Sequence, residues 1–174
     1  MKKYDAKLLV HHVNLKHRFE DRSQVEKDCC AKTIDWLLTK GYKFDVHQST
    51  FFYGDLPKIA IKDIQIVSVF TAIIFRTYQV DNLLLSWHKG EVNREDINKG
   101  FRVRKVLEAL ESPMPKFVFP IENMTRADMV AVLPKKLYEF VSSCRTPRGV
   151  DPCGKCVTCL EYLNQKLSLP KPIL

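Results

Sequence analysis

A group of cysteines near the C-terminal end constrains this chain more than any other feature of its sequence. The four residues are Cys144, Cys153, Cys156 and Cys159, and their spacing is C-x8-C-x2-C-x2-C. A C-x2-C turn supplies two thiolates from one short loop, and zinc prefers a tetrahedron of such soft ligands at about 2.3 Å from each sulfur. Four thiolates also leave no coordination position for a substrate. The sequence therefore predicts one structural zinc ion.

Two other interpretations of the cysteine group stay open. The run C-x2-C-x2-C resembles part of a ferredoxin ligand set, but the bacterial run continues as C-x3-C-P and this chain does not. The thiols could also be free. Gly154 allows the backbone to fold tightly around a metal. The two remaining cysteines, Cys29 and Cys30, fall in an expected helix, where core packing is the simplest role.

The composition is that of an ordinary globular protein. The chain has 174 residues, 45% of them hydrophobic and 28% charged, which is enough for one domain with a core. Its net charge of +8 fits an anionic partner such as a nucleotide, a nucleic acid or an acidic protein, and fits a basic soluble surface equally well. Charge alone therefore fixes no partner.

The location of the chain is predicted from its first residues and its cysteines. Tyr4 and Asp5 interrupt what would be the apolar part of a signal peptide. The longest apolar stretch, residues 64–75, is too short and too often broken to span a bilayer. Six cysteines without a secretion signal favour a reducing compartment. We therefore expect a cytoplasmic protein with no membrane partner.

Strand-like and helix-like segments alternate along the chain, which predicts an α/β fold with a mostly parallel sheet covered by helices on both faces. We expect strands at 7–15, 44–52, 81–87 and 116–120, and helices at 23–41, 59–78, 101–110, 125–134, on to about 141, and 160–167. Residues 1–141 should form the α/β domain. Residues 142–174 should form a zinc-binding segment packed on it.

The cysteine motif and the segment before it resemble one enzyme family. Cys144-x8-Cys153-Gly-Lys-Cys156-x2-Cys159 is similar to the zinc motif of 7-cyano-7-deazaguanine synthases, in the PP-loop ATP-pyrophosphatase superfamily. Residues 119–128, Phe-Pro-Ile-Glu-Asn-Met-Thr-Arg-Ala-Asp, resemble the strand and capped helix that precede the cysteines in that family. Residues 10–15 and the helix that follows resemble its second strand and second helix.

The resemblance implies a five-stranded parallel sheet and an ATP-dependent activity. Family members activate a carboxylate on a deazaguanine precursor and convert it to a nitrile with ammonia. Their product feeds queuosine in tRNA, or deazaguanine bases in phage and bacterial DNA, and some relatives belong to antiphage systems.

The chain departs from the family pattern at two places. The family begins with a strand and an S-G-G-x-D-S loop that holds the pyrophosphate of ATP, whereas this sequence contains no Gly-Gly pair. Residues 100–104, Gly-Phe-Arg-Val-Arg, stand where the family has a Tyr-Pro-Asp-Cys-Arg-like stretch. We therefore expect a truncated PP-loop-like fold that binds no ATP alone. A protein partner or a second copy would cover the vacated central strand position, because unpaired buried backbone groups are costly.

Two functions fit these departures. The first is a degenerate relative, inactive by itself, that binds a protein, a nucleotide or a nucleic acid, in a phage or antiphage-defence setting. The second is the C-terminal part of a split ATP-dependent enzyme whose phosphate loop comes from another chain. The missing loop favours the first function, because without it nothing preorganised stabilises charge on the phosphates.

Basic residues near the end of an expected strand are candidate anion ligands. His88 and Lys89 follow the strand at 81–87 at its C-terminal end, where α/β proteins hold ligands. With Arg102 and Arg104 they could hold an anion, although an exposed polar loop explains them as well.

A second basic group lies among the cysteines. Arg145, Arg148 and Lys155 could contact a nucleic acid or a protein partner, or they could favour thiolates or face solvent. His11 and His12 alternate in a strand and should point to opposite faces, so they make a poor joint metal site. Spacing alone supports no pair of nucleophile and base.

Overall fold

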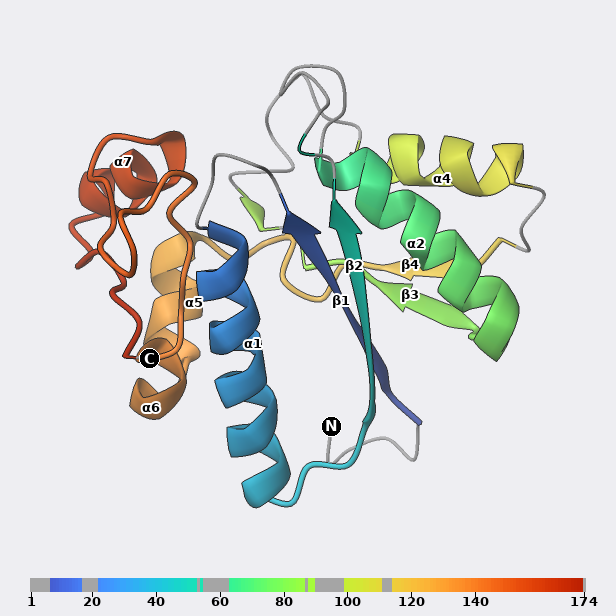
Figure 1. Cartoon of the computed structure of the whole chain (residues 1–174), viewed down its shortest axis with the longest axis horizontal. Coiled ribbons are helices and arrows are strands. Elements are labelled where there is room, and N and C mark those ends of the chain that lie inside the picture. The colour runs from blue at the N-terminus through green and yellow to red at the C-terminus, as the bar shows by residue number, and fades with distance from the viewer. Residues whose placement is uncertain are drawn as a thin grey trace. The chain divides into compact units, whose positions relative to one another are not determined.

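Strands and helices alternate along the chain in a computed structural model, which describes residues 7–16, 22–52, 54, 63–86, 88–89, 99–110 and 114–173 (Figure 1). The chain divides into two compact units. One consists of residues 1–55 with 130–174, and the other of residues 56–129. The described strands form two parallel pairs, one in each unit. The expected α/β class is therefore confirmed.

The first unit begins with a β-α-β motif. β1 (Leu9–Lys16) and β2 (Asp45–Phe52) pair in parallel over eight residues each, and α1 (Arg22–Thr39) connects them. α1 ends as its sequence predicts, because Gly41 adopts φ +78°. The N–H of Gly41 then donates to the carbonyl of Leu38, and the N–H of Tyr42 donates to that of Leu37. This pattern is a Schellman motif, which satisfies the last carbonyls of a helix.

The start of α1 differs from the prediction. The Ser-x-x-Glu pattern at Ser23 predicts the N-cap there, but the helix already includes Arg22. Ser23 therefore lies within the first turn, where the side chain of Arg22 forms an ion pair with Glu26 one turn later.

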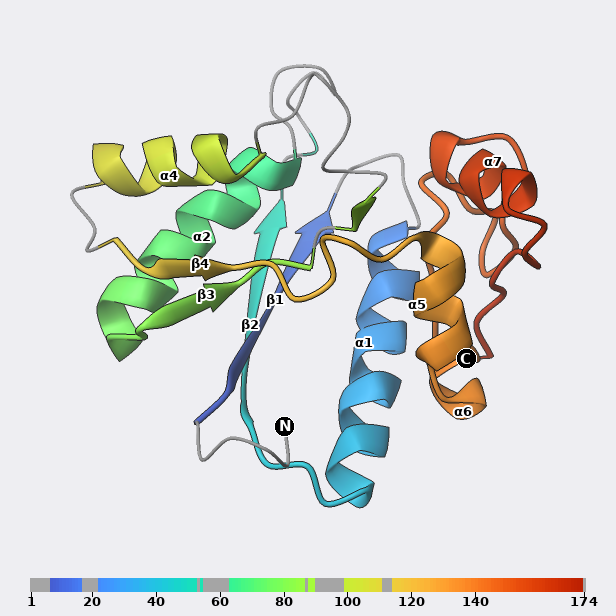
Figure 2. The ribbon, with the colours of Figure 1, turned by 180° about the vertical axis from the view of Figure 1, so that it is seen from behind.

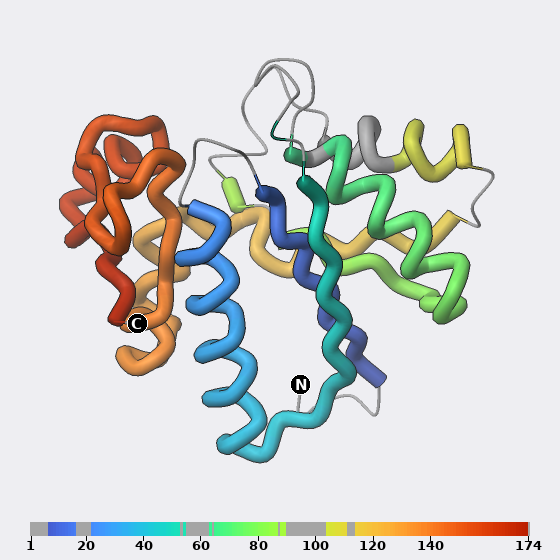
Figure 3. The backbone as a smooth tube through the Cα atoms, in the orientation of Figure 1, coloured from blue at the N-terminus to red at the C-terminus, as the bar shows by residue number. Residues whose placement is uncertain are grey.

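The C-terminal part of the first unit packs beside α1. It contains α6 (Lys135–Tyr138) and α7 (Val157–Asn164), and both views of the ribbon show α1 next to α6 (Figures 1 and 2). The chain then folds back, as the tube in Figure 3 shows. The N–H of Ile173 donates to the carbonyl of Glu139 at 2.9 Å, and Lys32 of α1 donates to the carbonyl of Ile173 at 2.8 Å. These two bonds fasten the C-terminal segment to α1.

The second unit packs two helices on a short parallel pair. α2 (Asp63–Tyr78) precedes β3 (Asn82–Leu84), and α4 (Lys99–Ala109) connects β3 to β4 (Lys116–Val118). α5 (Arg126–Val132) follows β4 and crosses the boundary between the units. Ala72 of α2 and Leu107 of α4 are both 0% exposed and pack with Leu83 and Phe117 of the strands.

Residues 59–78 are apolar on most sides, which predicts a buried helix, and this prediction is wrong in the part that the structure describes. Ile66, Ala72 and Phe75 are buried, but Val69 and Ile73 are 40% and 52% exposed. α2 is therefore buried over only part of its surface.

Three features stay predictions: the single sheet of a truncated PP-loop fold, a domain boundary at residue 141, and a partner over the central strand position. Among the described residues, no helix is long and apolar enough to cross a membrane.

Candidate metal centre

The four predicted cysteines come together in the first unit. The sulfurs of Cys144, Cys153, Cys156 and Cys159 all lie within 4.8 Å of one another. Cys144 and Cys159 are buried, whereas the other two are half-buried. In the described part of the chain, no other group of three or more His, Cys, Asp or Glu residues brings its ligand atoms together in this way. The cluster could therefore hold a metal ion.

A tight turn explains the eight-residue spacer between the first two cysteines. The N–H of Arg148 donates to the carbonyl of Asp151 at 3.0 Å, and the N–H of Asp151 donates back to Arg148 at 3.1 Å. Gly149 adopts φ +57° inside this turn, a conformation that favours glycine. The reversal returns the chain to its starting point, so the N–H of Cys153 donates to the sulfur of Cys144 at 3.2 Å.

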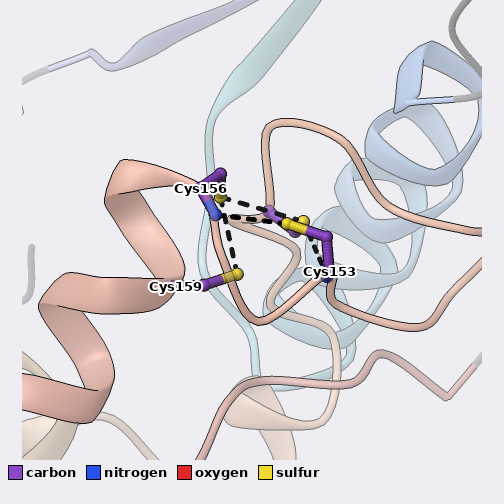
Figure 4. Close-up of side chains that lie close together, drawn as sticks. Cys153, Cys156 and Cys159 are labelled. Carbon is purple, nitrogen blue, oxygen red and sulfur yellow. Dashed lines mark hydrogen bonds between the residues drawn. The ribbon is translucent and has the colours of Figure 1, made fainter.

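The last three cysteines of the cluster come from one loop and the start of α7 (Figure 4). Gly154 turns the chain with φ +71°, and the N–H of Cys156 donates to the sulfur of Cys153 at 3.3 Å. Cys156 is the N-cap of α7, and Cys159 occupies the first turn of that helix. The helix therefore begins three residues before the predicted start at Leu160, because its N-cap is itself one of the clustered cysteines.

The spacing of the sulfurs fits a single ion. The sulfur of Cys156 lies 4.0 Å from that of Cys144 and 3.5 Å from that of Cys159. A tetrahedron with Zn–S bonds of about 2.3 Å places its sulfurs about 3.8 Å apart. The observed distances lie on either side of that value, so a small ion with four thiolate ligands needs little rearrangement.

Hydrogen-bond donors favour the thiolate at two of the cysteines. The hydroxyl of Thr146, the N–H of Lys155 and the N–H of Cys156 lower the pKa of Cys153 to about 5. Burial opposes ionisation at Cys156, but the N–H groups of Arg145 and Cys159 outweigh it and lower the pKa of Cys156.

Burial has the opposite effect at the other two cysteines. It raises the pKa of Cys144, and it raises the pKa of Cys159 to about 12, with Cys156 contributing further to the latter. A bound cation would remove this difference in protonation among the four thiols, because a coordinating thiol loses its proton outright.

The three basic residues predicted beside the cysteines contribute differently from one another. Arg145 donates its backbone N–H to the sulfur of Cys156 at 3.5 Å and its Nε to the hydroxyl of Thr158 at 3.4 Å. Lys155 donates its backbone N–H to Cys153. Arg148 is exposed in the turn described above. The backbone N–H groups of Arg145 and Lys155 thus act on these sulfurs.

The predicted anion ligands fall in the second unit. His88 is 4% exposed, and its Nε2 lies 3.1 Å from Nη2 of Arg126, the first residue of α5. A guanidinium can only donate, so Nε2 of His88 accepts this bond. Lys89 is exposed, and its N–H donates to the carbonyl of Met124 at 3.0 Å.

Of the two predicted arginines, the structure describes the side chain of Arg104 only. Arg104 is exposed on α4, and its guanidinium carbon lies 5.8 Å from the ring centre of Phe117. The side chain of Arg102 falls outside the described residues. An anion site made of His88, Lys89, Arg102 and Arg104 stays a prediction.

Sequence reasoning missed Arg126, although it correctly predicted the helix that carries it. The N–H of Thr125 donates to the carboxylate of Asp128 at 2.8 Å, and the N–H of Asp128 donates to the hydroxyl of Thr125 at 3.2 Å. This reciprocal pair is the predicted capping box. A second omission was the pairing of His11 with Ser49, whose Oγ lies 3.0 Å from Nε2 of His11. The register of β1 and β2 creates that contact, and no local pattern signals it.

Comparisons with protein families, with curated proteins and with solved structures give no match to this chain.

Proposed function

We propose that the four cysteines hold one structural zinc ion, and that the chain works by binding rather than by catalysis, as a degenerate relative of 7-cyano-7-deazaguanine synthases. The observation that carries the proposal is the cluster of four sulfurs within 4.8 Å of one another. Four thiolates complete a tetrahedron, so the metal has no open position for water or substrate. Its role is therefore to stabilise the fold.

Zinc fits this cluster better than an iron–sulfur cofactor does. Cysteine sulfurs 3.5 and 4.0 Å apart can meet at one ion. Cysteines that bind different irons of an iron–sulfur cluster stand farther apart, whereas all four sulfurs here lie within 4.8 Å of one another. The N–H donors to the sulfurs of Cys144, Cys153 and Cys156 also disperse the negative charge of a tetrathiolate site.

The metal would connect three neighbouring segments of the first unit. Cys144 follows α6, Cys153 belongs to the loop, and Cys156 and Cys159 belong to α7. α7 has eight residues, and isolated helices shorter than about 12–15 residues are marginal in water. Because ligands of this kind rarely form a site in the unfolded chain, the free energy of metal binding becomes free energy of folding.

The binding role rests on the family resemblance of residues 119–159 together with the closed metal site. Neither element supplies a group that reacts with ATP. The sequence also contains no Gly-Gly pair of the kind found in the family's phosphate loop. A protein, nucleotide or nucleic-acid partner remains compatible with the net charge of +8.

Native mass spectrometry of the purified chain tests both parts of the proposal. We expect one zinc ion per chain in a stable species whose mass does not change with ATP. A chain that carries iron and inorganic sulfide refutes the zinc assignment. Release of pyrophosphate from ATP by the chain alone refutes the binding role. Release only after a polypeptide bearing S-G-G-x-D-S is added would show the split enzyme instead.

A further inference from the structure

α7 has two apolar faces, and only one of them is used inside the protein. Thr158, Cys159 and Tyr162 are 9%, 3% and 3% exposed, so they form the inner face. The residues of the outer face are Val157, Leu160 and Leu163, which are 42%, 47% and 48% exposed. Residues three apart in a helix are rotated by about 300° about its axis, which is about 60° short of a full turn. These three side chains therefore lie along one slanting ridge. We name this ridge the α7 stripe.

Two cations stand at the ends of the α7 stripe. Lys155 precedes Val157 by two residues, and Lys166 follows Leu163 by three. Both lysines are exposed, and within the described residues neither forms a salt bridge. Other lysines of the same unit behave differently, since Lys136 pairs with Glu139 and Lys171 pairs with Asp151. The stripe is thus an apolar line with an exposed lysine on each side of it in the sequence.

Single exposed aliphatic residues are ordinary on a protein surface, but a contiguous apolar line marks an interaction site more often. We propose that the α7 stripe docks an amphipathic helix of a partner protein, apolar along one face and acidic at both ends of that face. The eight residues of α7 span about 12 Å, which matches roughly two turns of such a helix. This inference rests on the proposed zinc-stabilised binding function and names the chemistry of its partner.

Charge excludes a second copy of this chain as the occupant. A two-fold pairing centred on Leu160 would place Lys155 of one copy beside Lys166 of the other, twice. Like charges facing each other across an interface are unfavourable. A peptide with acidic ends avoids this repulsion.

The α7 stripe should form only while the metal is bound. Cys156 is the N-cap of α7 and Cys159 lies in its first turn, so two of the four ligands hold this helix. Removing the metal releases a helix that is too short to persist alone. We therefore expect docking to require the loaded centre.

The probe is a synthetic helical peptide of about 14 residues, with leucines along one face and glutamates near both ends. A matched peptide carries lysines in place of the glutamates. Binding of each fluorescent peptide to the zinc-loaded full chain is followed by anisotropy. We expect the acidic peptide to bind at least tenfold more tightly, and this preference to shrink as salt is added. Chelation of the metal should abolish binding.

Substitutions within and outside the α7 stripe show which residues contact the peptide. Leu160→Gln with Leu163→Gln should weaken the acidic peptide at least tenfold, whereas the matched exposed residue of α2, in Ile73→Gln, should not change it. Lys166→Glu, which lies outside the cysteine cluster, should reduce the preference for the acidic peptide. Zinc content is measured for every variant, so that loss of the metal is not mistaken for loss of the contact.

Three results overturn the inference. They are equal affinity for the two peptides, undiminished binding by the Leu160 and Leu163 variant, and self-association of the zinc-loaded chain that this variant abolishes. Zinc analysis separates this inference from the proposed function. A chain without zinc refutes the proposed function, whereas a zinc-loaded chain that ignores both peptides refutes only the docking of an acidic helix.

Discussion

Replacing one thiolate tests the metal centre most directly, and Cys156→Ser is the most informative substitution. The sulfur of Cys156 lies near two other sulfurs, at 4.0 and 3.5 Å, and the side chain is only half-buried. The fold should therefore tolerate a smaller oxygen at this position. Structural zinc contributes about 10–16 kcal/mol of apparent binding free energy. One ligand in four then accounts for about 3–4 kcal/mol, or roughly a 10²–10³-fold loss of affinity.

Competition with a chromophoric chelator measures this loss. The matched control is Cys30→Ser, which removes a half-buried free thiol of α1 that lies outside the cluster. The control should bind zinc as tightly as the unaltered chain. Zinc affinity that changes by less than about threefold in Cys156→Ser would refute a four-thiolate site, since an effect that small is less than 1 kcal/mol.

Three further predictions concern the stability of the fold. Leu107→Ala should lower the free energy of unfolding in urea by about 2–5 kcal/mol because Leu107 is 0% exposed, and Leu110→Ala, at a site 38% exposed, should cost much less. Thr125→Ala should cost about 0.5–2 kcal/mol in the same assay through loss of the α5 cap, and no change would contradict the capping box. Burial, followed by the proximity of His47 and His12, lowers the pKa of His11 below 6.5. The unfolded chain then binds more protons, so stability should fall as the pH drops from about 6.5 through the folded-state pKa, and His11→Gln should flatten that pH dependence.

Local signals in the sequence predicted the fold well where the structure depends on neighbouring residues. Gly41 ends α1 and Thr125 begins α5, because each end is determined by a few adjacent backbone groups. The extent of burial was harder to predict. An apolar composition predicted that α2 is buried on most sides, yet Ile73 is 52% exposed because burial depends on how many elements surround a helix. The strand expected at 81–87 is β3, which covers only Asn82–Leu84 because its ladder with β4 is three residues long.

In the candidate site, too, local features could be predicted from the sequence and long-range contacts could not. The sequence identified all four cysteines, because ligand spacing is a local property of the chain. It did not identify the bond between His88 and Arg126, which are 38 residues apart and meet only through the packing of a strand end against a helix start. It also did not show the backbone N–H groups that donate to the sulfurs of Cys144, Cys153 and Cys156. A sequence does not show where a loop directs its amides.

The metal centre and the α7 stripe follow from one geometric fact. A ligand in the first turn of a short helix fixes the rotation of that helix about its axis as well as its position. With Cys159 directed inward at 3% exposed, Leu160 is turned about 100° away along the helix and Val157 about 160°. Val157 and Leu160 are 42% and 47% exposed in this orientation. Zinc in this chain would therefore do more than hold a loop closed, because it determines which side of α7 a partner can meet.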